Sequence, residues 1–300
     1  MTVILAFLSR ARLSAAAFLA CVVVIAAAPA MAQPAMWVVK DADSTIYLMG
    51  TVHVLRPETV WHNPKLDDAI ASADQLYLEI PIASQAEMMQ SMLPLVTQYG
   101  LSPNKPLSSR LTPDEYKTLQ EAAKDAGLPE AGLNIFRPWF AGMGISAAGL
   151  TKSGYDPESG VDTKLQKIFK ERGIAAKGLE TIEYQIKIFA NMSEADEMDY
   201  LRSCLKDYKE TATELDKMVS QWAAGDLPAM EKIFVTELKD ESSDLYKTLL
   251  VDRNKNWASE IQEMLKGKGV TFIAVGAGHL MGPDSVQVQL KALGIEAKRY

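Results

Sequence analysis

Two histidines occupy matching positions in two similar segments near opposite ends of the chain. The segments, TIYLMGTVHVLRPE at Thr45–Glu58 and TFIAVGAGHLMGPD at Thr271–Asp284, align without a gap and match His53 with His279. In each segment an apolar run rich in β-forming residues stops at a glycine, and the histidine follows three residues later. This pattern predicts a buried strand that delivers an imidazole at its end. Strand ends are where α/β folds place ligand chemistry.

The paired imidazoles could serve a metal ion or act as general bases near neutral pH. Two ligands of one metal cannot sit far apart, so the metal hypothesis requires the His53 and His279 side chains to lie within about 8 Å of each other. The alternative is two core histidines whose ring nitrogens are satisfied by backbone hydrogen bonds. The matched sequence context favours a site. The third histidine, His62, has no matching partner and stands in a segment typical of a loop.

A site with two histidines usually needs a carboxylate, and two glutamates are candidates. Glu79 interrupts the apolar segment Gln75–Ile80, where an unpaired carboxylate would be costly and a metal ion or an arginine would offset the cost. Glu180 follows the short apolar run Ala175–Leu179. Arg253 precedes the second histidine strand and could neutralise Glu79 or bind a carboxylate or carbonyl oxygen of a substrate. The alternative for Glu180 and Arg253 is a solvent-exposed position.

The hydrophobic pattern places most strands at the two ends of the chain and helices in the middle. The end segments with strand character are Trp37–Lys40, Thr45–Gly50, Gln75–Ile80, Val270–Val275 and Ile295–Arg299. Helical periodicity dominates between them, and Thr112 followed by Pro113 is typical of a helix N-terminus. The two histidine strands must meet if the ends form one sheet. We therefore expect a single α/β domain over residues 33–300, with a mixed central sheet built from N- and C-terminal segments and a large helical insertion spanning roughly residues 84–252.

Residues 1–32 have the pattern of a secretory signal peptide. Arg10 and Arg12 precede an apolar stretch, and Ala30-Met31-Ala32 supplies the small residues of a cleavage site before Gln33. A retained membrane anchor is the alternative, but the apolar stretch is short for a span. We therefore expect a periplasmic or secreted protein with no stable membrane span after cleavage.

The remaining composition limits the partners and the source of stability. The net charge is −7 without a basic cluster, which argues against nucleic acid as a partner. Loss of the signal would remove Cys21 and leave Cys204 as the single cysteine, so no intramolecular disulfide could form. The fold must then be held by its hydrophobic core.

The motifs together resemble the TraB/PrgY/GumN family, the GumN-like bacterial branch in particular, and more distantly the Tiki family of metal-dependent proteases. The resemblance covers nearly the whole chain after residue 32, and two G-x-x-H motifs with an acid between them are specific only in combination. It rests on Gly50-Thr51-Val52-His53, Leu78-Glu79-Ile80, Gly178-Leu179-Glu180-Thr181, Arg253-Asn254 with Trp257, and Gly276-Ala277-Gly278-His279-Leu280.

The resemblance implies an α/β core that assembles both histidines with glutamate and arginine. Its implied metal ligands are His53, Glu79 and His279, with Glu180 and Arg253 close by. The H-E-x-x-H signature of common zinc proteases is absent from the sequence, so Mn²⁺, Co²⁺ and Zn²⁺ all remain candidates.

Two functional hypotheses follow. The first is an exported metal-dependent hydrolase acting on peptide bonds, in which the metal polarises the scissile carbonyl and acidifies a bound water. Glu180 would then take the water proton as general base, and Arg253 would stabilise the oxyanion or position the substrate. The rival is a non-catalytic binding protein that sequesters a peptide or glycan in the same cleft. The two hypotheses differ in metal dependence and turnover.

Overall fold

The fold is built on one mixed six-stranded sheet. The computed structural model describes residues 32–81, 85–208 and 210–300, so the expected signal peptide lies outside the described residues except for Ala32. The strands follow the order β4-β3-β5-β2-β1-β6 across the sheet. Their bounds are β1 Met36–Lys40, β2 Ser44–Thr51, β3 Gln75–Leu78, β4 Ala176–Gly178, β5 Gly269–Gly276 and β6 Lys298–Arg299.

Strand direction divides this sheet into two parts. The strands β4, β3, β5 and β2 are parallel neighbours, whereas β1 pairs antiparallel with both β2 and β6. The segments Trp37–Lys40 and Thr45–Gly50 do form strands, and they pair as the antiparallel hairpin β1–β2. The expected mixed sheet from N- and C-terminal segments is also confirmed, because β5 lies between β2 and β3. The carboxyl ends of four parallel strands therefore lie along one edge of the sheet.

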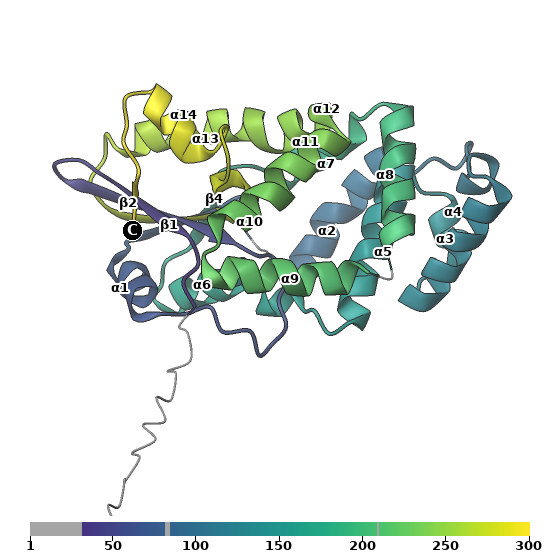
Figure 1. Cartoon of the computed structure of the whole chain (residues 1–300), viewed down its shortest axis with the longest axis horizontal. Coiled ribbons are helices and arrows are strands. Elements are labelled where there is room, and N and C mark those ends of the chain that lie inside the picture. Colours follow the sequence, from purple (N-terminus) through teal and green to yellow (C-terminus); the bar gives the residue numbers. More distant parts are fainter. Residues whose placement is uncertain (1–31, 82–84, 209) are drawn as a thin grey trace, which may run out of the picture. The chain divides into compact units, whose positions relative to one another are not determined.

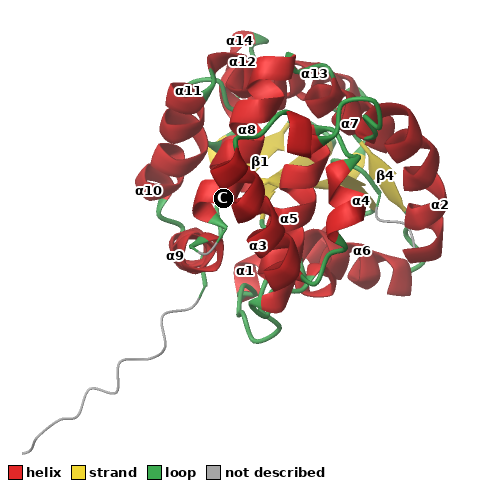
Figure 2. Ribbon diagram, turned by 90° about the vertical axis from the view of Figure 1, so that its right-hand side faces the viewer, coloured by secondary structure: helices red, strands yellow, loops and turns green. Residues whose placement is uncertain are grey.

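Helices cover both faces of the sheet (Figure 1 and Figure 2). On one face lie α1 (Pro64–Ser72) and α6 (Val161–Glu171), and the ring centroid of Phe169 in α6 is 6.2 Å from that of Phe272 in β5. On the other face lie α13 (Asp252–Met264) and α14 (Val286–Ala292). Buried side chains from both faces form the main hydrophobic core.

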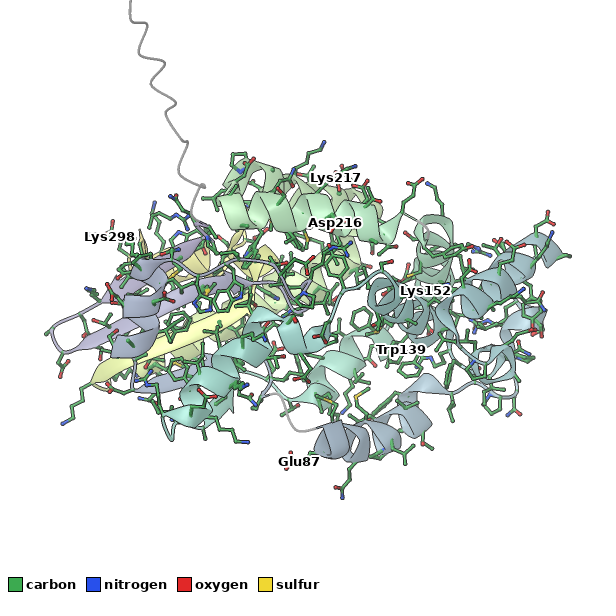
Figure 3. The ribbon with its side chains drawn as sticks, turned by 90° about the horizontal axis from the view of Figure 1, so that it is seen from below. Glu87, Trp139, Lys152, Asp216, Lys217 and Lys298 are labelled. Carbon is green, nitrogen blue, oxygen red and sulfur yellow. The ribbon has the colours of Figure 1, made fainter. Side chains whose placement is uncertain are left out.

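The long insertion is mainly helical, and α6 with β4 returns from it to the sheet. A second core forms inside the insertion from α3, α5 and α8, and Thr112 caps α3 through a capping box, as its sequence predicts. Trp139 of α5 is fully buried in a third cluster (Figure 3). The insertion helices are α2 Gln85–Leu95, α3 Pro113–Ala126, α4 Glu130–Asn134, α5 Pro138–Lys152, α7 Ile182–Ala190, α8 Glu194–Asp207, α9 Thr211–Ala224, α10 Leu227–Glu231, α11 Leu238–Glu241 and α12 Ser243–Tyr246.

Shorter helical turns connect these elements. Three are π-helical: η1 Val96–Gly100, η4 Lys232–Glu237 and η5 Lys247–Val251. Three are 3₁₀ turns: η2 Leu107–Ser109, η3 Pro157–Ser159 and η6 Ala277–Leu280. Among the described residues, no helix combines the length and apolar character needed to cross a membrane.

The two histidine strands are adjacent, but their pairing is offset from their sequence match. The sequence matches Gly50 with Gly276, whereas the β2–β5 ladder pairs Gly50 with Val275 and Thr51 with Gly276. Because side chains alternate between the faces of a strand, an offset of one residue sends equivalent residues to opposite faces. Equivalence in sequence is therefore not equivalence in space.

Candidate functional site

All five residues singled out in the sequence meet at the carboxyl edge of the parallel strands. His53 follows β2, Glu79 follows β3, Glu180 follows β4 and His279 follows β5. Arg253 reaches them from the first turn of α13. The Nε2 atoms of the two histidines lie 3.9 Å (His53) and 3.7 Å (His279) from the same atom, Glu79 Oε1. The expectation that the two histidine side chains meet is confirmed.

His53 sits at the open side of the site and faces a carboxylate. Its side chain is 59% exposed, and its Nδ1–H donates to Asp162 Oδ2 at 2.9 Å. The other oxygen of Asp162 accepts a hydrogen bond from Thr51 Oγ1 at 2.9 Å. Loss of water around the ring lowers the pKa of His53, but the Asp162 carboxylate, helped by Glu79, outweighs this effect and raises the pKa to about 9.

His279 sits at the closed side and faces an amide. Its side chain is 5% exposed, and its Nδ1–H donates to Asn254 Oδ1 at 2.6 Å. The orientation of Asn254 is fixed because its Nδ2 donates to the Asp284 carbonyl at 2.8 Å. The Trp257 ring packs beside the imidazole with 4.3 Å between centroids. Burial lowers the pKa of His279 to about 3, against the opposing effect of Glu79.

Glu79 connects the two histidines. Its Oε1 also accepts the backbone N–H of Gly276 at 2.7 Å, and its Oε2 accepts Arg253 Nη2 at 2.5 Å. Burial alone would raise the pKa of this carboxyl. The neighbouring groups on His279, Arg253 and His53 outweigh burial and hold the pKa of Glu79 well below its usual range. The carboxylate is therefore ionised at neutral pH.

Arg253 forms a buried hub beside Glu79. Its Nε and Nη2 donate to Glu180 Oε1 and Oε2, each at 2.9 Å, and its Nη1 donates to the Leu249 carbonyl at 3.0 Å. A further Nη1 hydrogen bond reaches His279 Nε2 at 2.9 Å. Gln185 Nε2 donates to Glu79 Oε2 at 3.0 Å and to Glu180 Oε2 at 3.2 Å. Two buried carboxylates thus share one guanidinium, which offsets much of the cost of burying them.

Each motif glycine makes room for the opposite motif. A Cβ on Gly276 would lie 3.1 Å from Glu79 Oε1 and 3.2 Å from His53 Nε2. A Cβ on Gly50 would lie 3.1 Å from the Ala277 backbone. The glycine of each G-x-x-H motif therefore permits the close approach of the two strand ends.

A cavity of about 280 Å³ opens beside these groups and is lined by His53, Glu79, Arg253 and His279. Glu180 is absent from this lining and lines a different hollow of about 340 Å³ with Ile80 and Ile182. Among the described residues, no group of three or more His, Cys, Asp or Glu side chains forms a ready-made metal site. The side chains that come closest to forming such a site are His53, Glu79 and His279, and the Arg253 guanidinium lies among them.

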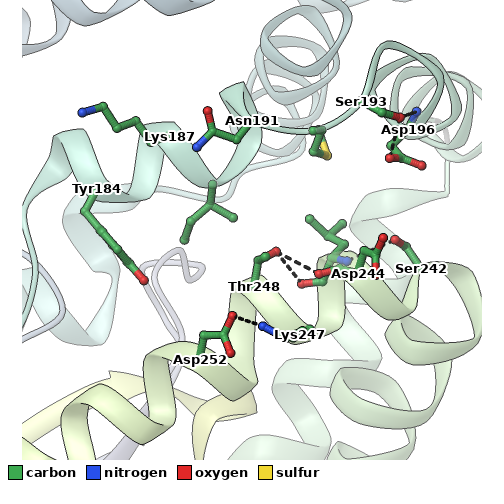
Figure 4. A pocket seen from close by; sticks show the side chains of 13 residues that line it. Tyr184, Lys187, Asn191, Ser193, Asp196, Ser242, Asp244, Lys247, Thr248 and Asp252 are labelled. Carbon is green, nitrogen blue, oxygen red and sulfur yellow. Dashed lines mark hydrogen bonds and ion pairs between the residues drawn. The ribbon is translucent and has the colours of Figure 1, made fainter.

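A larger groove lies between α7 and η5 and holds about 620 Å³ (Figure 4). Its two lysines are neutralised by neighbours: Lys187 Nζ lies 2.7 Å from Glu183, and Lys247 Nζ lies 2.5 Å from Asp252. Both ammonium groups are therefore neutralised by nearby carboxylates, and they do not converge on one point of the groove. We therefore place the chemistry in the smaller cavity, where buried charges converge.

Sequence reasoning missed three partners of the site. Asp162 lies in the first turn of α6, where acids are common, so nothing in its local pattern marks it. Asn254 was noted only as the neighbour of Arg253. Gln185 lies in α7, one turn after Glu180. Glu180 precedes Thr181, the N-cap of that helix, so the five-residue spacing between Glu180 and Gln185 is not a helical signal.

The fold and the site together define an α/β protein with a buried histidine–glutamate–arginine cluster at the carboxyl ends of its parallel strands. The chain belongs to the TraB/PrgY/gumN family, whose model matches residues 35–299. It is also similar to a protein of Treponema pallidum (strain Nichols) described as an uncharacterized protein. The two are 23% identical over 265 residues, which cover 83% of this chain and 78% of that protein. No solved structure matches the chain.

Proposed function

We propose that this protein is an exported, divalent-metal-dependent hydrolase of peptide bonds, with His53, Glu79 and His279 as metal ligands. The observation that carries the proposal is the convergence of both Nε2 atoms on Glu79 Oε1, at 3.9 and 3.7 Å. Two ligands that are each about 2.1 Å from one ion are at most about 4.2 Å apart, so both separations fit a shared ion. Imidazole and carboxylate donors suit Mn²⁺, Co²⁺ and Zn²⁺.

The Nδ1 contacts of the two rings support the same proposal. Histidines that bind a metal through Nε2 usually donate their Nδ1–H to an oxygen acceptor, which fixes the ring and its tautomer. His53 donates to Asp162 and His279 donates to Asn254 in this manner. Arg253 Nη1 currently donates to His279 Nε2 and must withdraw toward Glu180 before that atom binds an ion.

The bound ion would polarise the scissile carbonyl and activate a water molecule. Arg253 is buried beside the ligands and can stabilise negative charge that develops on the carbonyl oxygen. Glu180 was the expected general base, but it lines the neighbouring hollow rather than this cavity, and both of its oxygens accept hydrogen bonds from Arg253. One of those bonds must break before Glu180 takes a proton, so we assign to Glu180 the additional role of orienting Arg253.

The test is metal-dependent turnover by protein purified without chelator. Metal content is measured first, and cleavage of a fluorogenic peptide library is then followed with Mn²⁺, Co²⁺ or Zn²⁺. We expect His279→Ala to lose at least about 100-fold in rate, because the ion would lose a ligand. His62→Ala is the matched control, since His62 lies outside the site and pairs with Asp67 at 2.6 Å. Wild-type protein that shows neither metal-dependent cleavage nor a metal-dependent melting temperature would refute the proposal.

A second candidate is a non-catalytic binding protein that sequesters a peptide or glycan. The contacts of Arg253 favour it, because its guanidinium pairs with Glu79 and Glu180 and its Nη1 already donates to His279 Nε2. Such a protein would bind its ligand in the same cavity without turnover. Replacement of His279 would then change affinity alone.

A further inference from the structure

The cavity beside the paired histidines is lined by both polar and apolar side chains. The polar ones include His53, Glu79, Arg253 and His279. Its larger apolar side chains, here called the apolar wall, are Leu215, Met218, Phe234 and Leu250. A cavity with both kinds of lining can hold the polar backbone of a substrate at its polar groups and an apolar group at the wall.

The apolar wall is in direct contact with the second histidine motif. Phe234 packs on Gly278, where an added Cβ would lie 3.1 Å from Cβ, Cγ and Cδ1 of the phenylalanine. Phe234 belongs to η4 and Leu250 to η5, and both segments are π-helical. Such turns are rare and frequently occur at functional sites.

Helix α9 supplies the other half of the wall and is anchored next to it. Asp216 of α9 accepts hydrogen bonds from Arg56 Nε at 2.8 Å and from the Tyr155 hydroxyl at 2.6 Å. The next residue, Lys217, is 62% exposed and pairs with Glu214 within the helix (Figure 3). The anchor keeps Leu215 and Met218 at the cavity while Lys217 remains in solvent.

Size and exposure limit what the cavity can hold. About 280 Å³ falls at the lower limit for sites that enclose a whole small ligand, so part of a longer molecule fits better. The exposed His53 marks the open side and the buried His279 the closed side. A chain could enter beside His53 and insert one side chain.

We infer that the apolar wall receives one apolar side chain of a peptide, next to the bond presented to His53, Glu79 and His279. This inference rests on the proposed peptide hydrolysis and adds substrate selection to it. Leu215, Met218, Phe234 and Leu250 are then specificity-determining residues. They act by burying apolar surface of the substrate.

The first experiment measures binding apart from catalysis. Acetyl-Gly-Phe-Gly-amide and acetyl-Gly-Ser-Gly-amide are titrated into the full exported protein in metal-free buffer and followed by ligand NMR. We expect the phenylalanine peptide to bind about tenfold more tightly than the serine peptide. Met218→Gln should remove most of this preference. Lys217→Gln is the matched control on the same helix and should retain it, and Phe234→Ala provides a second variant of the wall.

The second experiment sequences the products of a mixed peptide library cut in the presence of metal. We expect apolar residues to be enriched on one side of the cut, and Met218→Gln to lower kcat/KM for those peptides about tenfold. Cleavage without such enrichment would overturn the inference and leave the hydrolase proposal standing. Selective binding without cleavage would sink the hydrolase proposal and support the wall as the selective surface of a binding protein. Equal binding of the two peptides, or a preference unaffected by both wall variants, would overturn the inference.

Discussion

His53 and His279 end segments that match in sequence, yet their surroundings differ in exposure, partner and charge. His53 is 59% exposed and paired with the Asp162 carboxylate, whereas His279 is 5% exposed and paired with the Asn254 amide. The pKa of His53 is raised and that of His279 is lowered. The two motifs also differ in local structure: β2 and β5 pair with a one-residue offset, and β5 continues into the 3₁₀ turn η6 that holds His279, whereas His53 lies in no helical turn. A sequence repeat here supplies two imidazoles with different properties to one carboxylate.

The largest effect should come from Arg253, which contacts the closed half of the site through Glu79, Glu180 and His279. In metal-free protein Arg253→Met leaves two buried carboxylates without their cation, and we expect a loss of about 3–5 kcal/mol in the free energy of unfolding. Urea denaturation measures this. Arg202→Met is the control, because Arg202 is 43% exposed and pairs with Glu115 and Asp199 at the surface, where the loss should stay below about 1 kcal/mol. Similar losses of unfolding free energy in both variants would show that the buried contacts of Arg253 add no more stability than a surface ion pair.

The same Arg253→Met protein tests whether Arg253 and a metal ion compete for His279 Nε2. Removal of the guanidinium frees His279 Nε2, so Zn²⁺ should bind more tightly than to wild type in a calorimetric titration. The added ion should also recover part of the lost stability, because a ligand that binds only the folded state stabilises it. Weaker Zn²⁺ binding in the variant would mean that Arg253 supports the ion rather than competing with it.

Replacing each histidine with alanine tests how much the exposed His53 and the buried His279 contribute to stability. His279→Ala should cost about 2–4 kcal/mol, since it leaves a void and removes the partner of Asn254 and Arg253. His53→Ala should cost less than His279→Ala, because the 59% exposed imidazole leaves no buried void and its loss mainly removes the hydrogen bond to Asp162. Both variants should lose metal-dependent hydrolysis. Equal unfolding free energies for the two variants would contradict the larger contribution to stability that we assign to His279.

Gly276→Ala tests the close approach of the two motifs. The new methyl group would press on Glu79 Oε1 and His53 Nε2, so overpacking should cost about 1 kcal/mol. Displacement of His53 should also weaken Zn²⁺ binding by about tenfold or more. Gly144→Ala is the control, since among the described residues its added Cβ would meet nothing within 4 Å beyond its chain neighbours and its own helix backbone. Unchanged Zn²⁺ affinity in Gly276→Ala would show that metal binding does not depend on a glycine at position 276.

Titration of the two histidines should also make the stability of the metal-free protein depend on pH. Because the pKa of His53 rises from 6.5 to about 9 on folding, its contribution is present below pH 6.5 and is lost as pH rises toward 9. Because the pKa of His279 falls from 6.5 to about 3, stability is lost as pH falls below 6.5 toward 3. Asp162→Asn should remove most of the alkaline loss, with Glu79 maintaining the remainder, and should leave the acidic loss. Urea midpoints measured across this range check both signs, and an unchanged alkaline slope in Asp162→Asn would contradict the assignment.

Much of the fold and the centre of the site could be predicted because both leave local patterns. The apolar runs with terminal glycines placed β2 and β5, and an acid in an apolar run marked Glu79. Other features depend on contacts between distant segments. Asp162 meets His53 only because α6 packs beside the end of β2, where Val161 N–H donates to the Val52 carbonyl at 3.0 Å. The different exposure of the two histidines depends on which distant segments pack around each strand end, and similar local sequences do not encode this.

The position of β5 between β2 and β3 also constrains the order of folding. The ladder joins Ser44 to Gly269, so the first long parallel contact awaits the last part of the chain. Until β5 inserts, β2 and β3 expose unpaired edges, which favour association with other chains. Pairing over such sequence distances is intrinsically slow. Completion of the sheet and assembly of the site are thus a single late step, and a nascent chain that ends before residue 269 has neither.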